Sequence, residues 1–376
     1  MSKRTVVEIN LGAIKSNLSQ IKKKIGPKVK ILLPVKADAY GHGIIEVSKF
    51  VEANGLVDML GVASFDEAVL LRRAKIKSPI LILGLLSPHF KNFSKIIDYN
   101  LTLSLADSNY LQAINQMAFK KKKKVKVHLK IDTGMGRIGC QVEDALNLVQ
   151  EIKRLKNIDL EGIFSHFPVA DQSEEKFTLN QIKKFQGVIK ALEKQGIKIP
   201  LKHLANSAGI INFPKSWLDM VRPGLASYGY YPSWPKRSNY DLKPAMTLKS
   251  HLIFVKRVKA GVGLSYGLKY TPQRDSNIAT IPIGYGDGYS RFLSNKGKVL
   301  IKGKIYPVVG RVTMDQILIN LKDDSYPLGE EVILFGSEKI TAQTIAFWSK
   351  TIPYEVTCAI SKRVPRVYSK SDSTNS

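Results

Sequence analysis

The chain has 376 residues, and 58 lysines and arginines against 31 aspartates and glutamates give it a formal net charge of +27. Its length predicts two domains with a large core, and two cysteines, Cys140 and Cys358, are too few for a disulfide framework. No apolar segment is long enough to span a bilayer, and the first residues lack the apolar run of a signal peptide, so we expect a cytoplasmic protein without a membrane partner.

An amphipathic helix is predicted first, with Leu11, Ile14, Leu18, Ile21 and Ile25 on one face. Short apolar segments then alternate with helix-period segments up to about residue 225. The predicted strands are residues 30–35, 60–63, 80–84, 101–105, 125–131, 160–166, 203–206 and 220–222. The predicted helices between them are residues 44–53, 65–73, 90–99, 109–119, 142–153 and 179–195. Eight such repeats predict a parallel (β/α)8 barrel over residues 10–238.

The densest run of charge, the lysines at residues 120–124, lies between one of these helices and the next strand. A basic protein can bind nucleic acid, which we keep as the alternative from another functional class. No aromatic residues interleave with this run, although stacking on aromatic side chains is typical of proteins that bind single strands. We therefore interpret the run as a solvated loop.

The pattern changes after about residue 240. Five segments with Gly and Pro turns between them are rich in strand-forming residues: 247–258, 278–285, 298–309, 316–321 and 331–335. They predict a mainly β domain over residues 239–368, and we expect the strand-like opening, residues 1–9, to join it. Residues 231–238 are interpreted as the linker, and the polar residues 369–376 as a disordered tail.

Candidate chemistry lies where the barrel strands end, because barrel enzymes place their sites at that face. Lys36 ends the first predicted strand and precedes a glycine-bearing turn, so its amine is well placed for Schiff-base chemistry. The loops after the last two strands carry glycine, small residues and a hydroxyl group, as phosphate sites do. A lysine that faces a phosphate site suggests pyridoxal phosphate, with His166 able to stack on it and Arg222 able to reach its ring nitrogen. No metal site is predicted.

Seven motifs, in one order along the chain, carry a resemblance to a known family. They are VKADAYGHG from residue 35, HLKIDTGMGRIG from 128, RPG from 222, SYG from 265, GYGDG from 284, GRVTMDQ from 310 and RVPR from 363. Over about residues 5–368 the chain resembles alanine racemases, which are fold-type III pyridoxal phosphate enzymes. The resemblance implies a head-to-tail homodimer, in which each active site combines the barrel of one subunit with the β domain of the other.

The resemblance also implies which residues act on alanine. Two groups exchange its α-proton, Lys36 on the D-alanine face and Tyr266, contributed by the partner subunit, on the L-alanine face. Arg137 and the backbone of Met314 are expected to bind the substrate carboxylate. Since an arginine can only donate, Arg222 would keep the pyridine nitrogen of the cofactor unprotonated and so limit transamination.

Further residues match supporting positions of the family. The phosphate is expected at Tyr40, Ser207, the Gly224 backbone and Tyr354, with Asn206 and Leu225 beside them. The narrow passage to the site is matched by Asp171, Tyr285, Arg291, Arg311 and Ile352, and Asp315 belongs to this supporting set.

Lys130 shares one strand face with Lys126, His128 and Asp132. A buried lysine beside Arg137 would be electrostatically costly. Several family members convert the matching lysine to a carbamate, so we hypothesise that Lys130 becomes an anion that pairs with this arginine.

The predicted function is alanine racemisation by a two-base mechanism, supplying D-alanine for peptidoglycan. A broad-specificity or serine racemase of the same fold is the main alternative, and a decarboxylase or a single-domain cofactor carrier agrees less well with the motifs. The family usually has asparagine where this chain has Asp38, so the turn after Lys36 carries an additional negative charge.

Overall fold

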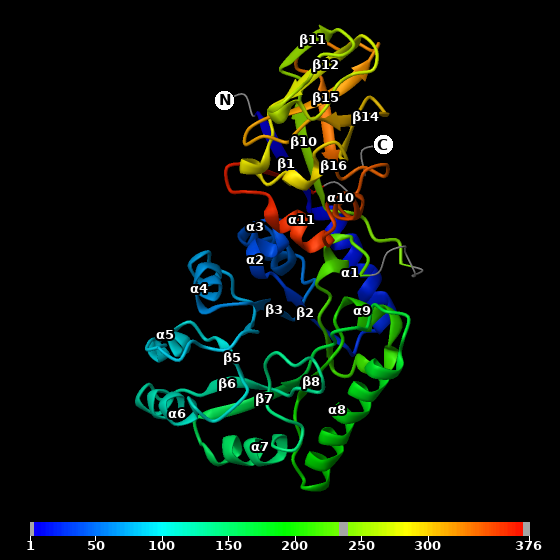
Figure 1. Ribbon diagram of the computed structural model, residues 1–376. Coiled ribbons are helices and arrows are strands. Elements are labelled where there is room, and N and C mark those ends of the chain that lie inside the picture. The colour runs from blue at the N-terminus through cyan, green and yellow to red at the C-terminus, as the bar shows by residue number, and fades with distance from the viewer. Residues whose placement is uncertain (1–3, 233–239, 371–376) are drawn as a thin grey trace.

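The eight predicted parallel strands are present and close into a barrel in the order β2 to β9. The computed structural model describes residues 4–232 and 240–370 (Figure 1). The barrel strands are β2 (Lys30–Pro34), β3 (Met59–Val62), β4 (Ile80–Ile82), β5 (Thr102–Leu105), β6 (Val125–Lys130), β7 (Ile158–Phe164), β8 (Leu201–His203) and β9 (Met220–Val221). Their near-continuous apolar runs follow from burial on both faces, since helices cover the outside of the barrel.

The helices of this part agree closely with the sequence pattern. They are α1 (Leu11–Ile25), α2 (Lys36–Tyr40), α3 (Ile44–Ala53), α4 (Phe65–Arg73), α5 (Phe93–Asp98), α6 (Leu111–Lys120), α7 (Ala145–Arg154), α8 (Lys176–Lys194) and α9 (Ser207–Asn212), with 3₁₀ turns η1 (Pro214–Ser216) and η2 (Leu225–Tyr228). Capping explains two sharp starts: the side chains of Asn10 and Ser64 accept backbone N–H groups of α1 and α4. No helix in the described part of the chain is long and apolar enough to cross a membrane.

Several barrel strands end one to three residues earlier than predicted, and for two of them this changes where a site residue lies. β7 ends at Phe164 and β8 at His203, whereas the sequence pattern extended them to His166 and Asn206. The apolar pattern continues beyond the last ladder hydrogen bonds, so composition alone does not mark where pairing ends. Both site residues therefore lie in loops above the barrel rather than at strand ends.

The second domain is built on a nine-stranded sheet in the order β11-β12-β15-β14-β13-β16-β10-β1-β17. Its strands are β1 (Thr5–Asn10), β10 (Met246–His251), β11 (Phe254–Val258), β12 (Ser276–Ile281), β13 (Lys298–Ile301), β14 (Lys304–Val309), β15 (Ile317–Lys322), β16 (Glu331–Phe335) and β17 (Arg366–Ser369). It also carries α10 (Ala342–Ser349), α11 (Pro353–Ala359), η3 (Tyr266–Leu268), η4 (Tyr285–Asp287) and η5 (Arg291–Leu293). Figure 1 shows α11 between this sheet and the barrel.

Two of the predicted β segments divide into pairs of strands. Residues 247–258 form β10 and β11, and residues 298–309 form the hairpin β13–β14. The hairpin turns at Lys302 and Gly303, which both have positive φ, as a two-residue turn of this kind requires. Most of the predicted linker and residues 371–376 lie outside the described residues, and Ser369, the first residue of the predicted tail, ends β17.

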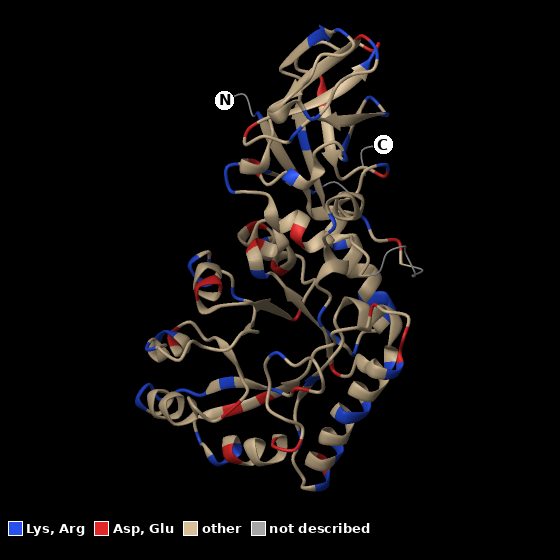
Figure 2. Ribbon diagram, in the orientation of Figure 1, with Lys and Arg blue, Asp and Glu red and all other residues tan. Residues whose placement is uncertain are grey.

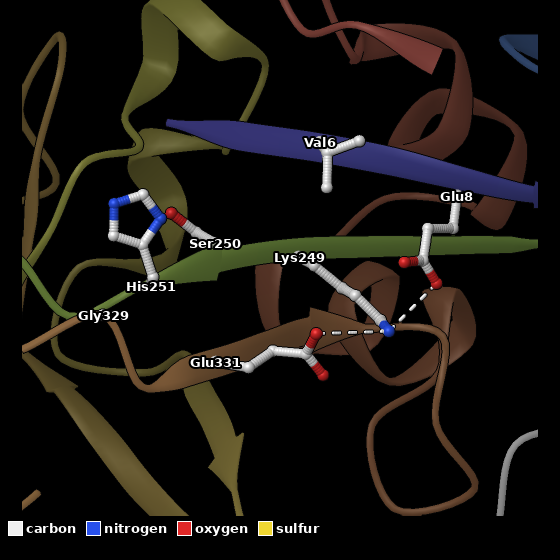
Figure 3. Close-up of a pocket in the computed structure, with 7 residues that line it drawn as sticks. All are labelled: Val6, Glu8, Lys249, Ser250, His251, Gly329 and Glu331. Carbon is white, nitrogen blue, oxygen red and sulfur yellow. Dashed lines mark ion pairs between the residues drawn. The ribbon is translucent and has the colours of Figure 1, made fainter. Parts of the chain in front are cut away.

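The first strand is held in the second sheet by pairing and by charge. β1 runs antiparallel to β10 and parallel to β17. Figure 3 shows Lys249 of β10 between two carboxylates, with its Nζ 2.9 Å from Glu8 of β1 and 3.4 Å from Glu331 of β16. One lysine thus connects three neighbouring strands. Elsewhere, Figure 2 shows lysines and arginines distributed over the helices and strands of both domains.

Asn17 joins α1 to the segment that enters the second domain. Its side chain is fully buried, and its Nδ2 donates to the carbonyls of Ser227 and Lys243 at 3.2 and 2.9 Å. Its Oδ1 accepts the Lys243 N–H at 2.8 Å. One amide therefore satisfies three backbone groups that would otherwise lose their partners on folding.

We expect Asn17→Ala to lower the free energy of unfolding by about 2–3 kcal/mol, because it leaves buried backbone groups without partners. Urea and thermal unfolding followed by circular dichroism measure the change. The matched control is Asn54→Ala, since Asn54 is exposed and its amide, within the described residues, donates to the nearby Phe50 carbonyl at the end of α3. Equal stability of the two variants would contradict the assigned role.

Candidate active site

The turn after Lys36 is left-handed, although the residues that form it are not glycines. Ala37, Asp38, Ala39 and Tyr40 have φ between 51° and 56°. Side-chain sterics make this conformation cost about 1–2 kcal/mol for each residue. The glycine-bearing turn predicted from the sequence therefore begins earlier, in strained non-glycine residues. Such strain persists only where the surrounding structure holds it in place.

Two carboxylates hold the strained turn. Glu67 accepts the N–H of Ala37 at 2.8 Å and that of Ala63 at 2.7 Å, so it links the turn to the loop after β3. Asp38 accepts the N–H of Ile44 at 2.8 Å, which places its negative charge at the N-terminus of α3, where the helix dipole favours it. The unusual Asp38 thus caps a helix.

Gly41 allows α11 to approach the same turn. Its φ is +83°, and a Cβ at this position would lie 2.1 Å from the carbonyl oxygen of Thr357. Only glycine fits this conformation and this contact. The second domain therefore packs directly on the backbone that presents Lys36.

Four cationic side chains and one histidine gather at the mouth of the barrel. They are Lys36, Lys130, Arg137, Arg222 and His166, and each lies within electrostatic reach of others in the group. Burial, and then Arg137, lower the pKa of Lys36, and the same two causes bring the pKa of Lys130 to about 7. Both amines are thus more available in the neutral, nucleophilic form. The excess of cations predicts that the site binds anions.

Arg222 is buried and donates in four directions. Its Nη2 lies 2.7 Å from the Ser165 carbonyl, 3.0 Å from the Leu204 carbonyl and 3.2 Å from Nδ1 of His166. Its Nη1 lies 2.8 Å from Nδ1 of His203. Since a guanidinium can only donate, both histidines must accept through an unprotonated Nδ1. Burial, followed by the charge of Arg222, lowers the pKa of both histidines well below its usual value.

A group of small and aromatic residues lies beside these cationic side chains. The ring of Tyr40 lies 5.6 Å from that of Tyr354. A Cβ on Gly224 would come within 2.8 Å of the Tyr40 hydroxyl, so glycine keeps this corner open. Ser207 accepts the N–H of Ala226 at 3.1 Å and thereby joins the starts of α9 and η2.

Two helix starts and two hydroxyls are a donor set that suits a phosphate. Burial raises the pKa of Tyr354 to about 12, with Asp171 as the second cause, so its hydroxyl keeps its proton and can donate. Burial likewise raises the pKa of Tyr40. Asn206 caps α9 by accepting the Gly209 N–H at 3.0 Å. The residues present therefore fit the phosphate of pyridoxal phosphate.

Leu225 begins η2 and Asp171 lies between β7 and α8, whereas the remaining predicted site residues lie on the second domain. Tyr266, Tyr285, Arg291 and Arg311 line one pocket of about 400 Å³. Tyr266 is 71% exposed, and Met314 and Ile352 are also largely exposed. β11 and β12, which flank the η3 turn of Tyr266 in the chain, lie at the end of this domain away from the barrel (Figure 1). Among the described residues, no hydrogen bond or ion pair joins this cluster to Lys36.

A ring of alternating charges holds the loop of Met314. Arg363 lies 2.7 Å from Asp287 and 2.5 Å from Asp315, and Arg4 lies 3.1 Å from Asp287. The backbone carbonyl of Met314 accepts the N–H of Gly286 at 2.9 Å. This loop is therefore fixed from two sides before any substrate binds.

Comparisons with known proteins assign the family. Sequence models described as the N-terminal and C-terminal domains of alanine racemase match residues 9–232 and 245–368. The chain belongs to the alanine racemase family. Alanine racemase 2 of Caldanaerobacter subterraneus subsp. tengcongensis is 44% identical over 369 residues, which cover 97% of this chain and 94% of that relative.

Solved structures of alanine racemases have the same fold. The alanine racemase of Clostridium difficile 630 superposes with a TM-score of 0.93 at 43% identity, covering 99% of this chain and 97% of that one. The alanine racemase of Bartonella henselae, described with covalently bound pyridoxal phosphate, has a TM-score of 0.87 at 27% identity. The superposition covers 97% of this chain and 99% of the Bartonella henselae chain.

Sequence reasoning missed Glu67, which holds the turn after Lys36, and His203, which accepts a hydrogen bond from Arg222. It also missed the contacts of His128 with His203 and with Glu161. The sequence pattern puts His128 on the polar face of the fifth barrel strand and His203 at a strand start, without assigning a role to either. The partners of both histidines depend on how neighbouring strands are aligned across the barrel.

We expect the racemase to lose stability as the pH falls from 6.5 towards 4. Burial lowers the pKa of His42 from 6.5 to about 4, and it also lowers those of His128, His166 and His203. Below pH 6.5 the unfolded chain binds protons on these imidazoles and the folded chain does not, so protonation favours unfolding. His42 alone contributes on the order of 3 kcal/mol at the lower limit.

Urea unfolding at a series of pH values measures this dependence. Carboxylates contribute little between pH 6.5 and 5, so that interval isolates the histidines. A free energy of unfolding that stays constant across the interval would show that the imidazoles are not held neutral.

Proposed function

We propose that this protein interconverts L-alanine and D-alanine with pyridoxal phosphate bound in the barrel. The observation that carries the proposal is the cationic group at the barrel mouth, where a lysine with a lowered pKa stands beside a buried, donor-only arginine. Two further observations support it: membership of the alanine racemase family, and a donor set suited to a phosphate at Tyr40, Ser207 and Gly224.

The cofactor would be held by the residues of this mouth. Lys36 offers a nucleophilic amine, and the donor set beside Tyr40 and Tyr354 offers a place for the phosphate. When bound, pyridoxal phosphate supplies an electron sink that makes the α-hydrogen of an attached amino acid acidic. The protonated guanidinium of Arg222 can only donate hydrogen bonds, so it would face the ring nitrogen and hold it unprotonated, which weakens that sink and disfavours transamination.

We propose that Lys36 and Tyr266 are the two bases and that they come from different subunits. The two residues belong to separate clusters of one chain, so a second copy would have to bring Tyr266 to the barrel. The face around Tyr266 leaves large apolar side chains exposed, among them Leu268, Phe292 and Met314. Such a surface is typical of a contact with another protein, which supports a head-to-tail homodimer.

Arg137 and the Met314 backbone would bind the substrate carboxylate, Arg137 through its planar guanidinium. Asp171, Tyr285, Arg291, Arg311 and Ile352 would narrow the passage, and Asp315 would support the Met314 loop. A pKa of about 7 makes the amine of Lys130 available to add carbon dioxide, which supports the carbamate hypothesis.

In the cell, we propose a cytoplasmic enzyme that supplies D-alanine for peptidoglycan, with residues 10–238 as the cofactor domain and 239–368 as the β domain. A broad-specificity or serine racemase is the second candidate. No partner other than the substrate and a second copy is proposed, because the basic residues are distributed over both domains.

The first test is Lys36→Ala. We expect the wild-type protein to bind pyridoxal phosphate covalently and to convert L-alanine to D-alanine, and the variant to do neither, because no other amine replaces Lys36 on its turn. Absorption spectroscopy and a chiral assay of alanine measure the two properties. Lys24→Ala, at the exposed end of α1, is the matched control. Retained racemisation in Lys36→Ala would refute the assignment.

The second test mixes two inactive variants. Lys36→Ala and Tyr266→Phe subunits are combined under conditions that allow exchange. In a mixed dimer one site carries both changes and the other carries neither, so we expect about a quarter of the wild-type activity to return. Absence of any recovery, or full activity of Tyr266→Phe alone, would contradict a two-base site shared between subunits.

A further inference from the structure

A continuous chain of hydrogen bonds runs from Arg222, which follows β9, through buried residues of β8 and β6 to Glu161 of β7 and Lys126 at the surface. Nη1 of Arg222 lies 2.8 Å from Nδ1 of His203, and Nε2 of His203 lies 2.8 Å from Nδ1 of His128. Nε2 of His128 lies 3.2 Å from Oε2 of Glu161, whose Oε1 is 2.5 Å from Nζ of Lys126. Both histidines are fully buried, whereas Lys126 reaches the surface.

The two ends of this chain set the direction of every bond in it. Arg222 only donates, so His203 accepts at Nδ1 and must carry its proton on Nε2. That proton is donated to Nδ1 of His128, which leaves the His128 proton on Nε2, facing Glu161. Hydrogen bonds from His128 and Lys126 overcome the effect of burial and lower the pKa of Glu161 to about 2, so Glu161 is an acceptor-only carboxylate.

The pairing of β6 with β7 is irregular at Glu161, and this irregularity favours the chain of hydrogen bonds. β6 pairs regularly with β7 up to Val127 and Leu160, and His128 then pairs with Gly162, so Glu161 is the extra residue of a β-bulge. Bulges redirect a side chain, here towards His128. A Cβ on Gly162 would lie 2.6 Å from Nδ1 of His128, so the glycine makes room for the imidazole.

Phe164 packs along the same path. Its ring is parallel to that of His203 at 4.8 Å, and the guanidinium carbon of Arg222 lies 5.6 Å from its centre. Stacking fixes the plane of the His203 ring, while the hydrogen bonds fix its tautomer. The chain of hydrogen bonds that leads to the Glu161 carboxylate thus fixes the position of the Arg222 guanidinium.

We propose that Glu161 is a positioning residue for the racemase, which acts through His128 and His203 to hold the Arg222 guanidinium against the ring nitrogen of the cofactor. This inference rests on the proposed function, since the cofactor belongs to it. Loosening Arg222 would weaken its control of the ring nitrogen. The side reaction that this control limits is the transfer of the amino group from alanine to the cofactor, which yields pyruvate and pyridoxamine phosphate.

Two variants test the chain by different routes, each with a matched control. Glu161→Gln removes the carboxylate charge, and Gly162→Ala displaces His128 without changing any charge. Glu46→Gln is the control for the first, because Glu46 pairs with a lysine, Lys49, on an exposed helix. Gly187→Ala is the control for the second, because no atom would lie within 4 Å of its added Cβ.

In the holoenzyme we expect both test variants to shift the absorption spectrum of the bound cofactor. We also expect pyruvate formation relative to racemisation to rise about tenfold, the lower end of the effect on affinity or activity when outer hydrogen-bond partners of metal ligands are removed. The KM for alanine stays unchanged, because the carboxylate-binding Arg137 is not in the chain. The two controls behave as wild type. Folded test variants with the wild-type spectrum and the wild-type ratio of products would overturn the proposal.

If neither variant folds, a measurement on the wild-type holoenzyme tests the chain of hydrogen bonds. The polypeptide contains six histidines, so ¹H–¹⁵N spectra of histidine-labelled protein can resolve each imidazole. Protons on Nε2 of both His128 and His203 support the chain, and a proton on Nδ1 of either overturns it. These tautomers do not depend on activity. A wild-type protein that fails to racemise alanine would therefore refute the proposed function and leave the hydrogen-bond chain to be judged separately.

Discussion

The constraint on which the barrel interior depends is a buried guanidinium that, in the described part of the chain, has no carboxylate in contact. Arg222 is 4% exposed, and burial lowers its pKa to about 9. Its charge is tolerated because two carbonyls and two histidines accept its hydrogen bonds. Those histidines must then be neutral, with their protons on Nε2. The protonation states of the site therefore follow from one side chain that can only donate.

The same constraint explains why the mouth of the barrel favours a ligand with negative charge. Lys36, Lys130 and Arg137 stand near Arg222, and like charges at short range oppose one another. Burial and this repulsion lower the pKa of both lysines, so both amines are more available in the neutral form. A phosphate and a substrate carboxylate would balance the remaining charge, so the cofactor and the substrate complete an electrostatic arrangement that the barrel leaves unbalanced.

Sequence patterns predicted the elements better than the contacts between them. α3 and α4 were predicted to the residue, because their apolar spacing is helical and Ser64 supplies a cap. The left-handed turn at residues 37–40 could not be predicted, because alanine and tyrosine do not favour positive φ. The link to Glu161 depends on a bulge, which shifts register without leaving a pattern in composition. The role proposed for Tyr266 rests on the family resemblance, because no hydrogen bond or ion pair among the described residues joins its cluster to Lys36.

The left-handed turn has a consequence for how Lys36 moves. A hinge would be built from glycine, which adopts positive φ without strain but remains free to leave it. Here non-glycine residues, held by the hydrogen bond to Glu67 and packed closely against α11, fix the backbone from which the lysine extends. The amine of Lys36 must then move by rotation about the side-chain bonds of this residue, because the backbone position of Lys36 is fixed. For the proton transfer proposed for Lys36, the fixed backbone sets where the side chain begins, and the length of the lysine sets how far its amine reaches.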